Sequence, residues 1–184
     1  MRENVAYLVD DDVRGRCLAA SREAVGLDPA AIVSAPPAVL TSVVAGMRPA
    51  DRVERIRKCA ELRLAGAPWR SYPGIGKPGV ERIELFTGTR PVLALESNGL
   101  RVLYRLGYGE RGRSYDATYK AVQREAAAEV PADVTAMQRA HQLLRRHGRS
   151  TCTRTSPACE FCPVLPMCAA GSGERSLADP FSTD

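Results

Sequence analysis

The chain has 184 residues, of which 45% are hydrophobic and 26% charged, and this composition fits one globular domain or two small lobes rather than a disordered chain. No apolar stretch approaches the roughly 18 residues that a membrane span needs, and Asp10, Asp11 and Asp12 stand where a secretory signal would stay apolar, so we expect a cytoplasmic protein with no membrane contact. The net charge is +5, and residues 101–154 carry 11 Lys and Arg against 5 Asp and Glu, an excess that suits a polyanionic partner such as nucleic acid.

Three helices are predicted in the first 64 residues. Apolar residues recur at helical spacing in the segments 14–25, 38–45 and 50–64. The stretches between these segments, "GLDPA", "SAPPA" and "GMRPA", are rich in residues that form turns. Alternating apolar and polar residues do not persist long enough to predict a sheet.

The next stretch, "WRSYPGIGKPGVERIELF" (about 68–86), predicts two helices joined by a tight turn. The first is brief and ends near Tyr72, and the second runs from about Lys77 to Phe86. Gly74 and Gly76 can take a positive φ, and because they lack side chains they let another molecule approach the backbone. The helix that follows offers unpaired N–H groups, which bind phosphate well. An ordinary helix–helix turn fits this stretch equally well.

Three later helices are predicted by apolar spacing and by the residues that flank them: residues 97–106 before Gly107, a helix between Asp116 and Pro131, and a helix from Asp133 to a stop at Gly148. Aspartate is a favourable N-cap, and glycine is a common residue just beyond a helix C-terminus. Residues 171–184 are predicted to form a flexible tail.

Four cysteines crowd into the stretch that follows the last predicted helix. Cys152, Cys159, Cys162 and Cys168 have the spacing C-x6-C-x2-C-x5-C. In a reducing compartment such a group is a metal site rather than a set of disulfides. Zinc sites favour two close cysteine pairs, and here there is one. Four thiolates on one short loop can instead bind a [4Fe–4S] cube, with one thiolate on each iron. The spacing therefore favours an iron–sulfur cluster and leaves zinc as the alternative.

Three motifs in the same order resemble one protein family. "YPGIGKPGVERI" resembles the helix-hairpin-helix of the DNA glycosylases, and the cysteine spacing is similar to that of the cluster loop in the endonuclease III and MutY family. Between them, "LALESNGLRVLYRLG" resembles the segment that carries the family's catalytic aspartate. The chain thus resembles the endonuclease III and MutY-like iron–sulfur branch of the helix-hairpin-helix DNA glycosylase superfamily.

The resemblance implies a fold and a partner. The fold would be all-α, with a helical barrel lobe over residues 1–88 that includes the hairpin, and a [4Fe–4S] cluster lobe over residues 89–170. The four cysteines would bind the cluster. The partner would be double-stranded DNA with one base flipped out of the helix, bound by a monomer.

The resemblance also implies roles for individual residues. Glu96 corresponds to the catalytic aspartate, and Asn98 is a candidate pocket residue, because a D-x-N pattern resembles the MutY and mismatch-glycosylase branch. DNA-binding roles fall to Gly74, Ile75, Gly76, Lys77, Arg149 and Arg154, the first four in the hairpin and the two arginines on either side of the first cluster cysteine.

Two departures from the family pattern change the expected activity. Pro78 stands where the bifunctional members have a nucleophilic lysine, so no Schiff base can form there and no strand nicking is expected. Glu96 is one methylene longer than the aspartate it replaces. We therefore expect a monofunctional DNA N-glycosylase that excises a damaged or mismatched base. The alternative is a non-catalytic DNA-binding iron–sulfur protein of the same fold.

Overall fold

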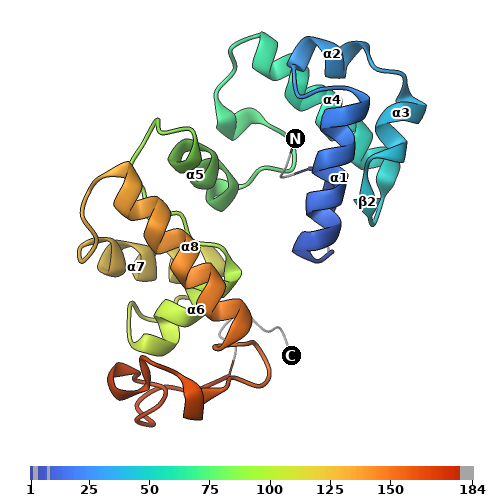
Figure 1. The fold of residues 1–184 in the computed structure, drawn as a ribbon. Helices are drawn as coiled ribbons and strands as arrows, with labels where there is room; N and C mark the ends of the chain where they lie inside the picture. Colours follow the sequence, from blue (N-terminus) through green and yellow to red (C-terminus); the bar gives the residue numbers. More distant parts are fainter. Residues whose placement is uncertain (2–3, 8, 179–184) are drawn as a thin grey trace. The chain divides into compact units, whose positions relative to one another are not determined.

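The computed structural model describes residues 1, 4–7 and 9–178 (Figure 1). The described residues are mostly helical, with one pair of two-residue strands, so the predicted all-α class is confirmed. The chain divides into two compact units, Met1–Val80 and Glu81–Asp184. This division falls inside helix α5 (Lys77–Phe86), whereas the sequence placed the lobe boundary at residue 88, just beyond the same helix. Among the helices of the described residues, none has both the length and the apolar character to cross a bilayer.

The first unit packs short helices on one longer helix. Its elements are β1 (Ala6–Tyr7), α1 (Asp11–Ala24), α2 (Pro29–Ser34), α3 (Pro37–Ser42), β2 (Ala45–Gly46), α4 (Pro49–Leu64) and the 3-10 turn η1 (Trp69–Ser71). The strands β1 and β2 pair in parallel. Helices α2 and α3 both contact α4. Their apolar faces form the core of this unit, with the buried residues Ile32, Ala35, Leu40, Val53, Ile56 and Ala60.

The aspartate run near the N-terminus has a structural role. Asp10 is the N-cap of α1, and its side chain accepts a hydrogen bond of 2.7 Å from the amide of Val13. Asp11 and Asp12 follow in the first turn, where negative charge interacts favourably with the helix dipole. The same chemistry forms a helix that the sequence pattern did not predict, because Asp28 caps the short helix α2.

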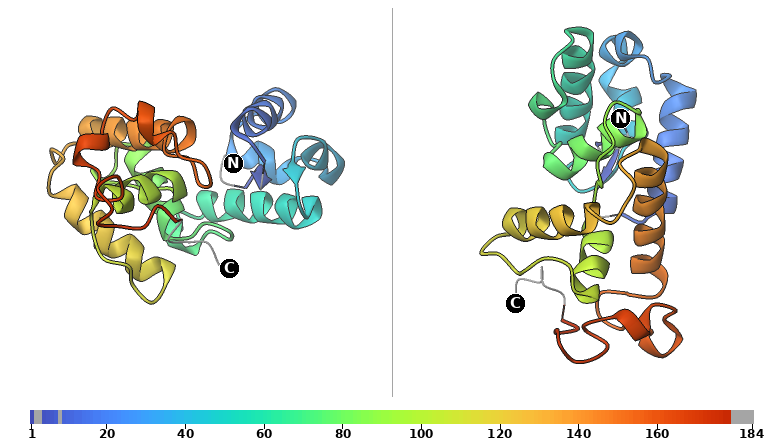
Figure 2. Two further views of the ribbon diagram at one scale, coloured as in Figure 1. Left: turned by 90° about the horizontal axis from the view of Figure 1, so that it is seen from below. Right: turned by 90° about the vertical axis from the view of Figure 1, so that its left-hand side faces the viewer.

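The second unit is built around α6. Its elements are the rest of α5, α6 (Ser97–Leu106), α7 (Tyr115–Ala127), α8 (Val134–Ser150) and the 3-10 turns η2 (Cys159–Phe161) and η3 (Leu165–Met167). Helix α6 contacts both α7 and α8 (Figure 2). The core of this unit contains the buried residues Leu85, Leu93, Leu95, Leu100, Leu103, Tyr119, Val122 and Met137.

The helix bounds of this unit agree with most of the predictions. Helix α6 ends at Gly107, which has a φ of 121°, and α8 begins after Asp133, as predicted. Helix α7 begins one residue before Asp116, because Ser114 is its N-cap. Helix α8 does not stop at Gly148 but continues to Ser150.

Gly148 serves close packing instead of ending the helix. A Cβ atom at this position would lie 2.7 Å from the carbonyl oxygen of Asn98 and 2.8 Å from its Cβ. Because real Cβ atoms do not approach backbone that closely, only glycine lets α8 lie against the start of α6 at this point.

Part of the predicted flexible tail packs against the second unit. Arg175 donates hydrogen bonds of 3.2 Å and 2.7 Å to the carbonyls of Tyr104 and Gly109. Its guanidinium also lies 4.8 Å from the centroid of the Tyr104 ring. Residues 171–178 are therefore held at the C-terminal end of α6, and residues 179–184, which belong to the same prediction, lie outside the described residues.

Candidate active site and cysteine cavity

The hairpin turn lies at the surface of the first unit. Gly74, Gly76 and Lys77 are exposed, and Ile75 is half-buried. Gly74 has a φ of 74°, and a Cβ there would lie 2.7 Å from the Oδ1 atom of Asn4, so this position requires glycine. Gly76 does not have a positive φ, so of the two glycines only Gly74 adopts this conformation.

Helix α5 starts directly after this turn. The amides of Gly79 and Val80 bond to the carbonyl of Gly76 at 2.9 Å and 3.0 Å. Pro78 falls in the first turn, where a helix has no intrahelical use for an N–H group, so it fits without strain. The main chain of the turn thus lies open at the surface, as close approach to another molecule requires.

Glu96 is the N-cap of α6, and hydrogen bonds fix both of its carboxylate oxygens. Oε1 accepts from the amide of Gly99 at 2.9 Å, and Oε2 accepts from Nδ2 of Asn98 at 2.7 Å. The side chain is half-buried. Each carboxylate oxygen has about two acceptor positions, so these bonds still leave capacity for a water molecule. Glu96 and Asn98, both predicted site residues, are therefore direct partners.

Arg101 links this pair to the cysteine loop. Its side chain is buried, with 4% exposed. It donates to Oδ1 of Asn98 at 3.0 Å, to the carbonyl of Gly148 at 2.6 Å and to the carbonyl of Cys152 at 3.0 and 3.1 Å. No role was predicted for Arg101. The signal for it is a pair of arginines, Arg101 and Arg105, among the apolar residues of α6, because a buried arginine must find polar partners.

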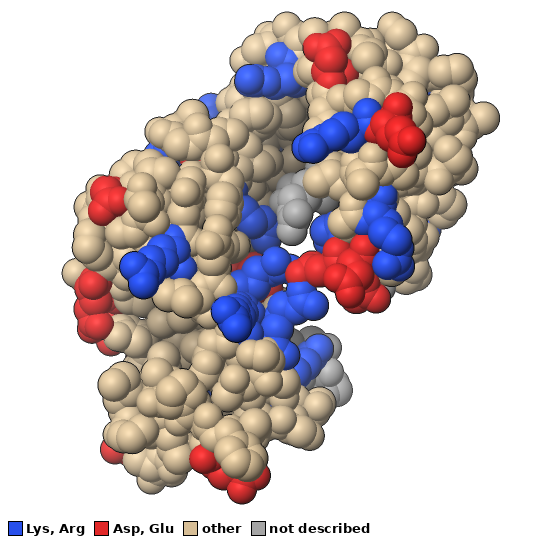
Figure 3. Space-filling model, viewed as in Figure 1, with Lys and Arg blue, Asp and Glu red and all other residues tan. Residues whose placement is uncertain are grey.

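An open cavity of about 570 Å³ lies beside these residues within the second unit. Its lining combines the start of α6, the start of α7, the end of α8 and the cysteine loop: Ser97, Asn98, Arg101, Tyr115, Gly148, Arg149, Thr153 and Arg154. It brings together three predicted site residues, Asn98, Arg149 and Arg154. Basic side chains gather over the C-terminal half of α8 (Figure 3). Three arginines and a helix N-terminus make this cavity suited to an anion.

The four cysteines line a second cavity. Hydrogen bonds connect them to their surroundings: Cys168 donates to the carbonyl of Arg105 at 3.4 Å, and Sγ of Cys162 lies 3.6 Å from Nε2 of His147. Burial lowers the pKa of His147, which favours its neutral form. No part in this site was predicted for His147, although it lies five residues before the first cysteine.

The spacing of the cysteine sulfurs bears on the group they would hold. In the described part of the chain, no three Cys, His, Asp or Glu side chains gather closely enough for a single metal ion. Tetrahedral zinc with Zn–S bonds of about 2.3 Å holds its sulfurs only roughly 3.8 Å apart. Each thiolate of a [4Fe–4S] cube binds a different iron, so its sulfurs stand further apart. The four cysteines line one shared cavity, an arrangement in which each thiolate of a [4Fe–4S] cube could bind a different iron.

Arg105 gives this fit a second support. It is 1% exposed, and its Nη1 donates to Sγ of Cys152 at 3.2 Å and to the carbonyl of Thr153 at 2.7 Å. Its Nη2 donates to the carbonyls of Arg154, at 3.1 Å, and Leu177. Its Nε is buried and, among the described residues, has no hydrogen-bond partner. A buried guanidinium needs negative charge nearby, and thiolates bound to a cluster would supply it.

Comparison with known proteins agrees with these features. No family model matches the chain. The sequence is 28% identical over 119 residues to endonuclease III of Treponema pallidum (strain Nichols), a match that covers 65% of this chain and 52% of the relative. The chain therefore matches only about half the length of this curated relative.

The fold matches solved structures over most of the chain. A trapped endonuclease III–DNA covalent intermediate gives a TM-score of 0.76 at 18% identity, covering 94% of this chain and 83% of that one. A non-covalent endonuclease III–DNA complex gives a TM-score of 0.74 at 19% identity, and the match covers 90% of this chain and 78% of that one. A thermostable thymine-DNA glycosylase gives a TM-score of 0.68 at 18% identity, and the match covers 87% of this chain and 78% of that one. The chain therefore shares the fold of these solved structures, and its sequence is similar to that of endonuclease III over 119 residues.

Proposed function

We propose that this protein is a DNA-binding iron–sulfur protein that acts as a monofunctional DNA N-glycosylase in base excision repair. It would release a damaged or mismatched base from double-stranded DNA and leave the strand intact. The observation that carries the proposal is the place of Glu96. Its carboxylate is fixed at the N-terminus of α6, hydrogen-bonded to Asn98, which lines the cavity with Arg149 and Arg154.

Glu96 is suited to the bond that such an enzyme breaks. Cleavage of an N-glycosidic bond develops positive charge on the sugar. A carboxylate held beneath the sugar stabilises that charge and can orient or deprotonate the attacking water. The bonds from Gly99 and Asn98 fix the carboxylate in place, so it need not reorganise during the reaction.

Two groups of residues, one in each unit, would hold the DNA backbone. Arg149 and Arg154 can pair with a phosphate, and the exposed turn at Gly74 and Gly76 can bind another phosphate through main-chain N–H groups. Such contacts position the duplex without reading its sequence. They would also offset the few kcal/mol that extruding a nucleotide costs.

The absence of a lyase step follows from Pro78. A proline has no side-chain amine that could form a Schiff base with the sugar. Lys77 is adjacent, but one residue along a helix turns a side chain by about 100°. It would therefore point away from the place that a lysine at position 78 would occupy.

The cysteine cavity would hold a [4Fe–4S] cluster. The ligands would be Cys152, Cys159, Cys162 and Cys168, with the guanidinium of Arg105 balancing the negative charge. Such a cluster cross-links its loop and fixes the residues on it. Arg154 and the carbonyl of Cys152 would thereby be held beside Asn98 and Arg101.

A panel of duplexes tests the proposal. The protein is incubated with DNA that contains uracil, a G·T mismatch, an A·8-oxoguanine pair or a hydroxymethyl-pyrimidine, and abasic sites are then cleaved with alkali. Strand breaks that appear only after alkali on one substrate support the proposed activity. Tight binding without release on any duplex would favour a non-catalytic DNA-binding iron–sulfur protein. Breaks without alkali would contradict the role given to Pro78.

A further inference from the structure

The segment that leads into Glu96 is buried but belongs to no helix or strand. Leu93, Ala94 and Leu95 are almost completely inaccessible to solvent. Buried main-chain groups need hydrogen-bond partners, and outside regular structure side chains can supply them. The placement of Glu96 therefore depends on which side chains hold these three residues.

Each of the three residues has a main-chain group bound by a different side chain. The amide of Leu95 donates to the hydroxyl of Tyr119 at 3.2 Å. The carbonyl of Leu93 accepts from Nε2 of Gln123 at 2.9 Å. The carbonyl of Ala94 lies 2.5 Å from Nδ1 of His141. Side chains from α7 and α8 thus fix the main chain immediately before Glu96.

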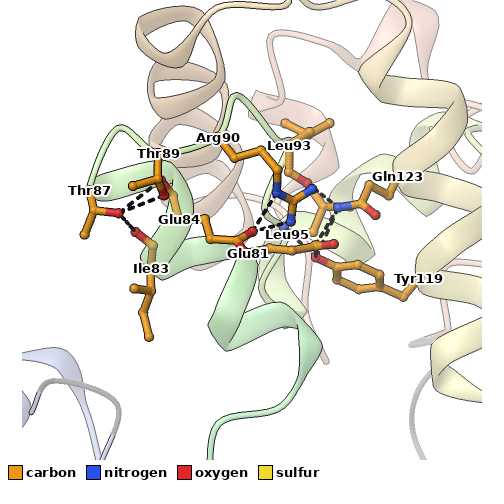
Figure 4. Close-up of polar contacts among 10 residues, drawn as sticks. All are labelled: Glu81, Ile83, Glu84, Thr87, Thr89, Arg90, Leu93, Leu95, Tyr119 and Gln123. Atoms are coloured by element: carbon orange, nitrogen blue, oxygen red, sulfur yellow. Dashed lines mark hydrogen bonds and ion pairs between the residues drawn. The ribbon is translucent and has the colours of Figure 1, made fainter. Parts of the chain in front are cut away.

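One buried carboxylate orients the two α7 side chains (Figure 4). Oε2 of Glu81, a residue of α5 that is 4% exposed, accepts from the Tyr119 hydroxyl at 2.6 Å and from Nε2 of Gln123 at 2.6 Å. Tyr119 has one hydroxyl hydrogen, so donating it to Glu81 leaves the oxygen to accept from Leu95. Gln123 has two amide hydrogens, one for Glu81 and one for Leu93.

We propose that Glu81, Tyr119 and Gln123 are positioning residues for the reaction of Glu96. This inference rests on the proposed glycosylase function. The three side chains hold the main chain ahead of Glu96 and thereby set where its carboxylate lies. An error of about 1 Å in such a position can cost about a hundredfold in rate. Glu96 replaces the shorter aspartate of related enzymes, so the main chain must place the longer side chain.

The same helix offers a matched control. Glu84 lies three residues after Glu81, and it pairs with Arg90 at the surface, accepting from Nε of Arg90 at 2.6 Å (Figure 4). Among the described residues, its carboxylate pairs with Arg90 and not with Leu93, Ala94 or Leu95. Glu84→Gln therefore makes the same chemical change as Glu81→Gln outside the buried network.

The first measurement is amide hydrogen exchange by NMR, which needs no substrate. Tyr119→Phe keeps the ring and removes the oxygen that accepts from Leu95. We expect exchange at the amides of Leu95 and Gly99 to become several-fold to about tenfold faster, and amides of the first unit to be unchanged. Unchanged exchange at Leu95 and Gly99 in Tyr119→Phe would overturn the proposal.

The second measurement is single-turnover base release at saturating protein, with DNA affinity measured separately. Glu81→Gln, Tyr119→Phe and Gln123→Met should each lower the rate about 10- to 100-fold, with affinity within about twofold of the wild type. Glu84→Gln should keep both values. A loss of affinity as large as the loss of rate would overturn the positioning role and indicate a general loss of structure.

A double variant shows whether the network acts through Glu96. Adding Tyr119→Phe to Glu96→Gln should lower the remaining rate by less than about twofold, because the group that the network positions has already been lost. An equal loss in both backgrounds would overturn the proposal. If wild-type protein releases no base at all, the proposed function fails, and the exchange at Leu95 and Gly99 still decides whether the network holds this segment.

Discussion

Arg101 donates two hydrogen bonds to the main-chain carbonyl of Cys152, at 3.0 and 3.1 Å. The same guanidinium contacts Asn98, which in turn contacts Glu96. A continuous chain of hydrogen bonds therefore runs from the first cysteine of the loop to the carboxylate at the start of α6. Side-chain hydrogen bonds thus connect the cysteine loop to Glu96 in this structure.

The cysteine cavity predicts an iron–sulfur protein. Protein purified without oxygen should be brown and contain about four irons per chain. Cys162→Ser should lose the colour and most of the iron, because it removes one of the four ligands. Cys17→Ser is the matched control, since Cys17 lies in α1 of the first unit and should leave the iron content unchanged. One zinc per chain and no iron would contradict the assignment.

Gly148 predicts a stability effect that depends on packing. Gly148→Ala places a Cβ 2.7 Å from the carbonyl oxygen of Asn98, so α6 or α8 must shift. Overpacking of this kind costs about 1–3 kcal/mol, of which the better helix propensity of alanine offsets up to about 1 kcal/mol. Gly15→Ala, inside α1 with no atom within 4 Å of the added Cβ, should raise stability by up to about 1 kcal/mol. Urea denaturation measures both, and a stabilised Gly148→Ala would contradict the packing described.

His141 predicts a loss of stability in mild acid. Burial lowers its pKa below the ordinary value of about 6.5, so the unfolded state binds the proton first as the pH falls. The contribution of neutral His141 to the free energy of unfolding is therefore complete above about pH 6.5, and it is lost as the pH falls from there toward the lowered pKa. The loss is at most about 1.4 kcal/mol per pH unit.

The measurement for His141 is a comparison with His141→Gln, which keeps a donor for the carbonyl of Ala94 but does not titrate. Free energies of unfolding from urea denaturation at pH 7.5 and 5.5 should fall more in the wild type than in the variant. His147 is present in both proteins, so its own titration cancels. Equal losses in the two proteins would show that His141 is not the group responsible.

Pro78 predicts the absence of a covalent intermediate. Reduction with borohydride during incubation with substrate should trap no protein–DNA complex, because no amine stands at position 78. Lys77→Ala should behave like the wild type in this assay. A trapped complex that disappears in Lys77→Ala would show that Lys77 supplies the amine and that the strand-nicking step is present.

The sequence predicted elements whose signals are local. The bounds of α5 and α6 follow from apolar spacing, and Gly107 and Asp133 act as the cap residues they resemble. The prediction that Gly148 ends α8 is wrong for a physical reason. A glycine that ends a helix and a glycine that allows two helices to touch cannot be told apart without knowing what lies opposite.

The site was predictable only in part. The family resemblance pointed to Glu96 and Asn98, and the cysteine spacing pointed to the four cysteines. The structure brings Glu96 and Asn98 into contact and lines one cavity with all four cysteines. Neither the resemblance nor the spacing pointed to Arg101 or Arg105, whose partners include main-chain groups about 50 residues away in the chain. Such long-range contacts are set by the fold and leave no periodic trace in the sequence.

The most direct test of the account compares wild type with Glu96→Gln and Glu96→Asp in single-turnover base release from the best duplex of the panel. The affinity of each of the three proteins for the same duplex is measured separately. We predict that Glu96→Gln lowers the rate at least about a hundredfold without weakening binding, and that Glu96→Asp loses a similar factor, because its carboxylate falls more than about 1 Å short. Release by Glu96→Gln at the wild-type rate would contradict the role of Glu96 and with it the proposed mechanism.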